Sequence, residues 1–68
     1  MSNSNWVHLD VDKIVHETDS AFLLRLQDGE EIWMPKSQID NPDIYQTGDE
    51  DLTISVTEWI AREKGLES

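Results

Sequence analysis

Cysteine is absent from this chain of 68 residues. Without thiols the protein can form no disulfide, no cysteine-ligated zinc site and no cysteine nucleophile. No apolar run in the sequence approaches the roughly 18 residues of a membrane-spanning segment. The polar residues 1–5 do not resemble the basic and apolar regions of a signal peptide. We therefore expect a soluble cytoplasmic protein that does not act on membranes.

Positive charge is scarce as well. Five lysines and arginines stand against 15 aspartates and glutamates, which gives a formal net charge of −10 at pH 7. Such a surface repels the phosphate backbone of nucleic acids and anionic lipid headgroups. Direct nucleic-acid binding is therefore disfavoured. A small barrel that binds single-stranded nucleic acid is the weakest functional hypothesis, because it needs a basic groove that five scattered cations hardly provide.

Motifs that carry catalysis or bind metals are also missing. The three glycines are isolated and form no phosphate-binding loop. Ser37 has no nearby base, since His8 and His16 both fall on the first predicted strand. On one strand these histidines lie roughly 26 Å apart, too far for one metal ion to join them. The acidic segment 40–51 lacks the ligand spacing of a calcium-binding EF-hand loop. We expect no enzyme, no catalytic residue, no metal and no cofactor.

Hydrophobic residues are nevertheless frequent enough for a folded domain. Leu, Ile, Val and Phe account for 17 of the 68 residues, above the roughly 20% that marks disordered chains. Three tryptophans add large apolar side chains. The sequence thus predicts one small domain over residues 6–66, preceded by a disordered N-terminus at residues 1–5.

The first half of the domain has the pattern of a β-meander. Apolar and polar residues alternate along 6–16, which predicts a strand whose inner face carries alternate aliphatic residues up to Val15. Lys13 and Ile14 interrupt this alternation and predict a bulge.

Two shorter strands are predicted at 21–27 and 31–34, joined by a tight turn at 27–30. The Asp-Gly pair in that turn favours the positive φ angles of a short hairpin. Leu23 and Trp33 are predicted to lie on the same outer face of these neighbouring strands.

The second half of the domain is more irregular. Pro35 ends strand pairing, and residues 36–39 predict one helical turn with Ile39 tucked under the sheet. Residues 40–51 carry five carboxylates and predict an acidic loop.

A fourth strand is predicted at 52–56, where aliphatic residues again alternate with polar ones. The period then changes to that of a helix at about 57–65. Thr57 is suited to cap its first turn, and Gly65 is suited to the left-handed position after its last turn.

These elements predict a mainly β fold with one short C-terminal α-helix. A sheet this small must cover its apolar face, so we expect a strongly curved antiparallel sheet. The other form that satisfies this need is an SH3/OB-like open barrel of about four to five strands, closed at one end by the helix.

Two sets of residues are candidates for contacts with a partner. Tryptophan is enriched at binding hot spots, and carboxylates can contact a basic partner. The first set is Trp33, Lys36 and Gln38. The acidic set is Asp28, Glu30, Glu31, Asp40, Asp43, Asp49, Glu50 and Asp51.

Two motifs of the chain are distinctive: WMPKSQI at residues 33–39 and WIAREKGL at residues 59–66. They resemble the Trp-apolar-Pro-Lys-Ser-Gln-Ile signature and the Trp-Ile/Leu-Ala-x-x-Lys-Gly-Leu ending of small acidic phage and prophage proteins. This resemblance extends over most of residues 14–66. It implies a bacterial host cell and a link to phage replication and recombination, and it provides no catalytic residues.

The leading hypothesis is a non-enzymatic accessory protein of phage origin that binds a protein partner. The resemblance implies that this partner takes part in DNA metabolism or host defence. The alternative is an acidic DNA mimic that inhibits a DNA-binding host protein. Pairing between sheet edges could in addition form a homodimer.

Overall fold

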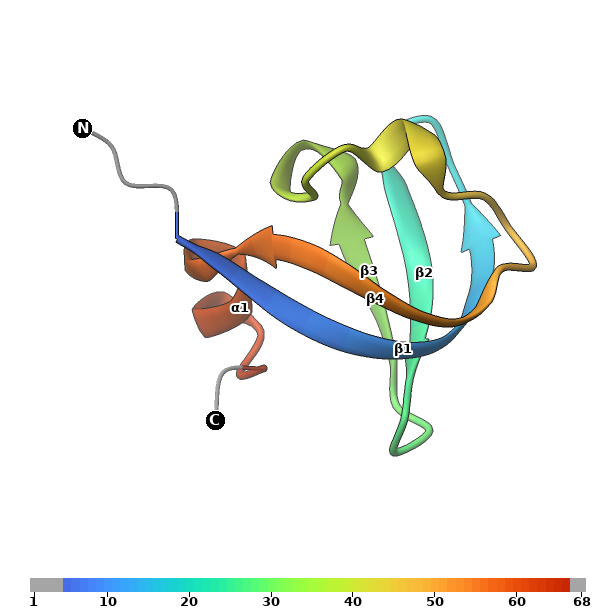
Figure 1. The fold of residues 1–68 in the computed structure, drawn as a ribbon, viewed down its shortest axis with the longest axis horizontal. Helices are drawn as coiled ribbons and strands as arrows, with labels where there is room; N and C mark the ends of the chain where they lie inside the picture. Colours follow the sequence, from blue (N-terminus) through green and yellow to red (C-terminus); the bar gives the residue numbers. More distant parts are fainter. Residues whose placement is uncertain (1–4, 67–68) are drawn as a thin grey trace.

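A computed structural model describes residues 5–66 of the protein. Three strands are followed by two short 3₁₀ helices, a fourth strand and one α-helix (Figure 1). In chain order the elements are β1 (Trp6–Glu17), β2 (Ala21–Leu26), β3 (Glu31–Pro35), η1 (Lys36–Gln38), η2 (Pro42–Ile44), β4 (Glu50–Thr57) and α1 (Glu58–Glu63).

The strands form one antiparallel sheet in the order β3-β2-β1-β4. The sheet is strongly curved, so that β1 and β4 cross in front of β2 and β3 in Figure 1, while α1 lies beside the start of β1. A single bridge between Ile39 and Val56 links the segment after β3 to β4. The predicted fold class is confirmed as a curved open sheet with one short C-terminal helix, and the sheet does not close into a barrel.

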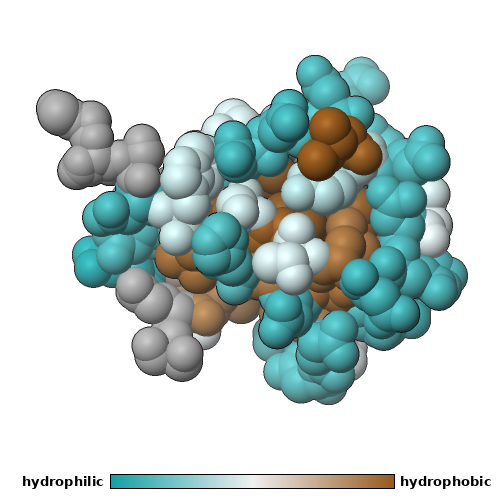
Figure 2. Space-filling model, viewed as in Figure 1, coloured by the Kyte–Doolittle hydropathy of each residue, from teal (hydrophilic) through white to brown (hydrophobic). Residues whose placement is uncertain are grey.

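The core lies on the concave side of the sheet, and every strand and α1 contribute to it. Half-buried apolar side chains such as Tyr45 and Leu66 pack around it. In the view of Figure 2, hydrophilic residues surround a band of hydrophobic surface in the middle of the molecule. The buried core residues are Leu9, Val11, Ile14, Phe22, Leu24, Met34, Ile39, Ile54, Val56, Ile60 and Ala61.

The predicted break in β1 is present, but its consequence differs from the prediction. The pairing of β1 with β2 shifts register on both sides of Ile14. Because one extra residue reverses which side chains face inward, Ile14 is fully buried and Val15 is only half-buried. The assignment of Val15 to the inner face is therefore wrong. The loop before β4 provides hydrogen-bond partners for the backbone of the bulge. Ile14 N–H donates to Asp49 C=O, and Gly48 N–H donates to Ile14 C=O.

The turn between β2 and β3 lies where the sequence predicts it. Leu26 C=O accepts from Gly29 N–H, and Leu26 N–H donates to Glu30 C=O. Gly29 alone in this turn has a positive φ, 92°, so the predicted positive angle at Asp28 is wrong. Asp28 contributes differently, because its carboxylate accepts from Glu30 N–H at 2.9 Å. This is a three-residue hairpin loop with a glycine bulge.

The segment between β3 and β4 is more ordered than an acidic loop. The predicted helical turn is present as η1, and Ile39 is 4% exposed. β4 begins at Glu50, two residues before the predicted start, because Glu50 still pairs with Lys13 of β1. Asp51 has a φ of 53°, which aspartate adopts more readily than most non-glycine residues.

Both ends of α1 have the predicted caps. Thr57 Oγ1 accepts from Ile60 N–H at 3.3 Å. At the other end Gly65 has a φ of 68°, its N–H donates to Arg62 C=O, and Leu66 N–H donates to Ala61 C=O. These two bonds are those of a Schellman motif, which satisfies the last carbonyls of a helix.

The start of the domain is attached to this helix. Asn5 C=O accepts from Glu58 N–H at 3.1 Å. Residues 1–4 of the N-terminal segment predicted to be disordered lie outside the described residues. No helix in the described part of the chain is long and apolar enough to cross a membrane.

Replacing Ile14 by alanine is expected to destabilise the protein far more than replacing its neighbour Val15. Ile14→Ala removes a fully buried side chain and should lower the free energy of unfolding by about 2–5 kcal/mol, whereas Val15→Ala should cost less than about 1.5 kcal/mol. Urea unfolding followed by tryptophan fluorescence measures both. Equal losses would show that the register of β1 differs from the one described.

The cap at Thr57 makes a second stability prediction. Its hydroxyl accepts from Ile60 N–H and donates to Gln38 Oε1 at 2.5 Å, so Thr57→Val should cost about 1–2 kcal/mol. Thr53→Val on the same strand is the matched control, because the exposed Thr53 hydroxyl makes only a 3.3 Å bond to Asp10. The same unfolding measurement should show a change below about 0.5 kcal/mol for this control. Similar losses for both variants would argue against the capping role.

Candidate partner-binding surface

Three side chains form an apolar and aromatic cluster on the convex face of the sheet. Leu23 in β2 is paired with Trp33 in β3 on one side and with His16 in β1 on the other. Neighbouring strands are about 4.8 Å apart, so Trp33 and His16 are separated by two such spacings. Their ring centroids are nevertheless only 6.2 Å apart, with an interplanar angle of 84°. Both side chains therefore lean over Leu23. We call His16, Leu23 and Trp33 the outer patch.

Trp33 is the most prominent member of the outer patch. It retains 45% of its surface exposed although it lies in the middle of a strand. The predicted pairing of Leu23 with Trp33 on one outer face is confirmed. His16 was not among the predicted binding residues. The alternation of β1 places it outward, but its contact with Trp33 depends on how the strands pair.

An open groove of about 570 Å³ begins at Trp33 and passes round the end of β3. Its lining combines apolar residues, such as Ala21 and Pro35, with two lysines. We call it the end groove. The residues that line it are Asp19, Ser20, Ala21, Trp33, Pro35, Lys36, Ser37 and Lys64.

The two lysines of the end groove differ in their surroundings. Lys36 Nζ is 2.6 Å from Glu17 Oε2 and 4.9 Å from the centre of the Phe22 ring. Its stem therefore covers the core while its charge is paired. Lys64, at the C-terminal end of α1, is exposed and forms no ion pair with any residue between 5 and 66. Lys64 therefore gives the groove a positive charge that no carboxylate between residues 5 and 66 pairs with, and the sequence alone did not place this charge there.

Gln38, the third residue of the first candidate set, does not line the end groove. It is half-buried, and its Oε1 accepts from the Thr57 hydroxyl. This bond joins η1 to the first turn of α1. The structure thus brings Trp33 and Lys36 together and separates Gln38 from them.

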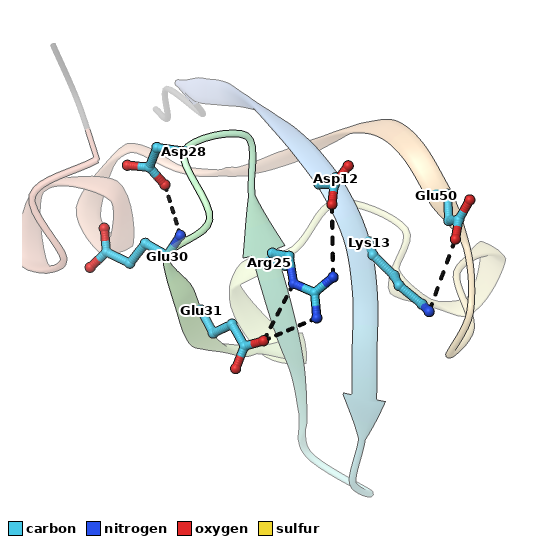
Figure 3. A network of polar contacts seen from close by, with 7 residues as sticks. All are labelled: Asp12, Lys13, Arg25, Asp28, Glu30, Glu31 and Glu50. Atoms are coloured by element: carbon cyan, nitrogen blue, oxygen red, sulfur yellow. Dashed lines mark hydrogen bonds and ion pairs between the residues drawn. The ribbon is translucent and has the colours of Figure 1, made fainter.

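Several of the acidic candidates lie at the end of the sheet formed by the β2–β3 turn (Figure 3). Arg25 lies between two carboxylates, with Glu31 at 3.4 Å and Asp12 at 4.0 Å. Glu30 differs from Glu31, because its side chain points away from Arg25 in Figure 3. The charges of Glu31 and Asp12 are therefore partly neutralised, whereas no basic side chain between residues 5 and 66 pairs with Glu30.

The remaining acidic candidates are distributed over the loop and the start of β4. Asp49 accepts from Gln46 N–H at 3.0 Å, and Glu50 is 4.0 Å from Lys13 Nζ. Asp51 reaches the turn end of the sheet, where it lines a hollow of about 300 Å³ with Asp10 and Gln27. Asp40 and Asp43 are exposed on the segment between η1 and β4. The eight predicted acidic residues do not form one cluster.

The histidines have separate environments. His8 Nδ1 is 2.8 Å from Ser55 Oγ, while His16 contacts Trp33. Within residues 5–66 no group of three or more His, Asp or Glu side chains is arranged to hold a metal ion.

No known family model, curated protein or solved structure matches this chain. The resemblance to small phage proteins therefore stays a prediction, and the function of the chain has to be inferred from the chemistry of its surface.

Proposed function

We propose that this chain is a non-enzymatic accessory module that binds a protein partner through the outer patch. The observation that carries this proposal is the exposed Trp33, supported on one side by Leu23 and His16 and bordered on the other by the end groove. Tryptophan with a rigid setting is typical of interface hot spots, where a large apolar side chain loses contact with water.

A purely structural role for Trp33 is less well supported. Its side chain lies on the convex face, outside the buried core cluster. Trp59 is also exposed, at 60%, but it lines neither of the two hollows described above. Trp33 is therefore the tryptophan whose surroundings offer both apolar contact and an adjoining depression.

The chemistry of the surface also indicates the kind of partner. The partner would present an apolar side chain to the outer patch. In the setting that the resemblance to phage proteins implies, it would be a phage or host protein that acts on DNA or in host defence.

A DNA mimic is the second candidate function, and the turn end of the sheet favours it. Asp28, Glu30 and Asp51 lie at this end together with Asp10 and Asp12. Such a surface could enter the basic groove of a DNA-binding protein. It ranks second because two basic side chains lie among these carboxylates. Arg25 pairs with Asp12 and Glu31, and Lys13 pairs with Glu50.

The two functions are distinguished by affinity capture from bacterial and phage-infected extracts, with Trp59→Ala as the matched control. We expect Trp33→Ala to weaken capture of the partner by about thirtyfold, because hot-spot tryptophans contribute about 2 kcal/mol or more. Trp59→Ala and wild type should capture equally, and neither salt nor duplex DNA should displace the partner.

Other outcomes have clear meanings. A partner that is released by moderate salt and by duplex DNA, and that is lost from Asp28→Asn/Glu30→Gln/Asp51→Asn, would support mimicry. If a folded Trp33→Ala variant captured the partner as well as wild type, the proposal that the outer patch is the binding surface would be wrong. Circular dichroism establishes that each variant is folded.

A further inference from the structure

The free edge of β3 carries backbone groups that have no partner in the sheet. Leu26 N–H donates to Glu30 C=O, and Lys36 N–H donates to Ser20 C=O. The register between these two pairs is regular, and antiparallel strands alternate between bonded and non-bonded pairs. The backbone groups of Glu31, Trp33 and Pro35 therefore point away from β2.

This edge is more open than the opposite edge of the sheet. Along β4 the Ile39–Val56 bridge and the bond from Asp40 N–H to Ser55 C=O cover part of the edge. Within residues 5–66 the outward N–H groups of Glu31 and Trp33 make no comparable bond. Pro35 has no N–H, which protects one position, but the rest of the edge can accept another strand.

The charges along this edge have opposite signs at its two ends. Glu30 precedes β3, exposed and directed away from Arg25. Lys36 follows β3, and Lys64 lies beside it across the end groove. A two-fold axis through Trp33 would place Glu30 of each chain opposite Lys36 of the other. An edge with this pattern is complementary to itself.

We propose that two copies of this chain pair antiparallel through β3, with Trp33 opposite Trp33. In this register the two Trp33 residues exchange both of their backbone hydrogen bonds. Glu31 N–H of each copy donates to Pro35 C=O of the other. Glu30 of each copy approaches Lys36 and Lys64 of its neighbour, at the mouth of the end groove.

The dimer is independent of the proposed function, because it uses the edge of β3 rather than the face that carries the outer patch. The two Trp33 side chains project from the same face of the continuous sheet, so pairing would join two outer patches. Repulsion between chains of net charge −10 opposes association. At physiological salt the Debye length is about 8 Å, which screens distant charges but leaves pairs in contact attractive.

Sedimentation velocity over a range of chain concentrations tests the pairing with two charge variants. Glu30→Lys places like charges opposite each other at both ends of the edge, and so does Lys36→Glu. Because Lys36→Glu also loses the ion pair with Glu17, circular dichroism first establishes that this variant is folded. Each variant alone should dimerise about tenfold more weakly than wild type. An equal mixture of the two should recover dimers, because Lys at position 30 then faces Glu at position 36. Asp43→Lys makes the same charge change as Glu30→Lys, but on η2 and away from the edge. This control should dimerise like wild type or better.

A second measurement does not depend on any variant. Hydrogen exchange of the Glu31 and Trp33 amides should slow as the concentration of wild-type chain rises. A wild-type chain that stays monomeric at millimolar concentration would overturn the proposal. So would a dimer that leaves these two amides unprotected, or charge variants whose mixture associates no better than each alone. Capture of an extended segment from another protein at this edge by an otherwise monomeric chain would show that the edge serves a different partner.

Discussion

The structure depends on the way that β1 serves both halves of the sheet. This strand pairs with β2 along its second half and with β4 along its first half and centre. A flat strand could not do so in a sheet that curves round a small core. The bulge at Ile14 provides the bend, and the backbone of Gly48 and Asp49 satisfies the groups that the bulge takes out of register. The fourth strand therefore begins from a loop that is already attached to the first.

Curvature also explains why an apolar cluster remains on the surface. A chain of 68 residues builds one core, and here the buried side chains of the strands lie on the concave face of the sheet. Residues that alternate with them face outward whatever their chemistry. For Leu23 and Trp33 this places large apolar side chains in contact with water, where His16 shields one side only. Retaining such a cluster costs solubility, which fits a surface that is covered in a complex. The formal net charge of −10 counteracts the tendency of such a cluster to aggregate.

Local chemistry made much of the fold predictable from the sequence. The caps at Thr57 and Gly65 depend on bonds within one helical turn, and the hairpin at Gly29 depends on one positive φ. The bulge was recognisable from the broken alternation. Its direction was not, because the burial of Ile14 rather than Val15 depends on bonds to a loop more than 30 residues further along the chain. The end groove and the contact between His16 and Trp33 could not be predicted from the sequence either. Both depend on how elements that are distant in sequence pack together.

The segment between η1 and β4 is fixed at both ends and contacts the core through Tyr45, with exposed residues between these points. Asp40 is held by Ser55, and Gly48 and Asp49 are held by Ile14. Residues 41–47 bridge these anchors and place Ile44, 63% exposed, on the surface. Changes in length are therefore best tolerated beside the exposed Asp43 and Ile44, and harmful at Tyr45, which packs on the core, and at the anchored residues. This makes the segment the natural position for an epitope tag or a fluorescent label that leaves the sheet, the outer patch and the edge of β3 undisturbed.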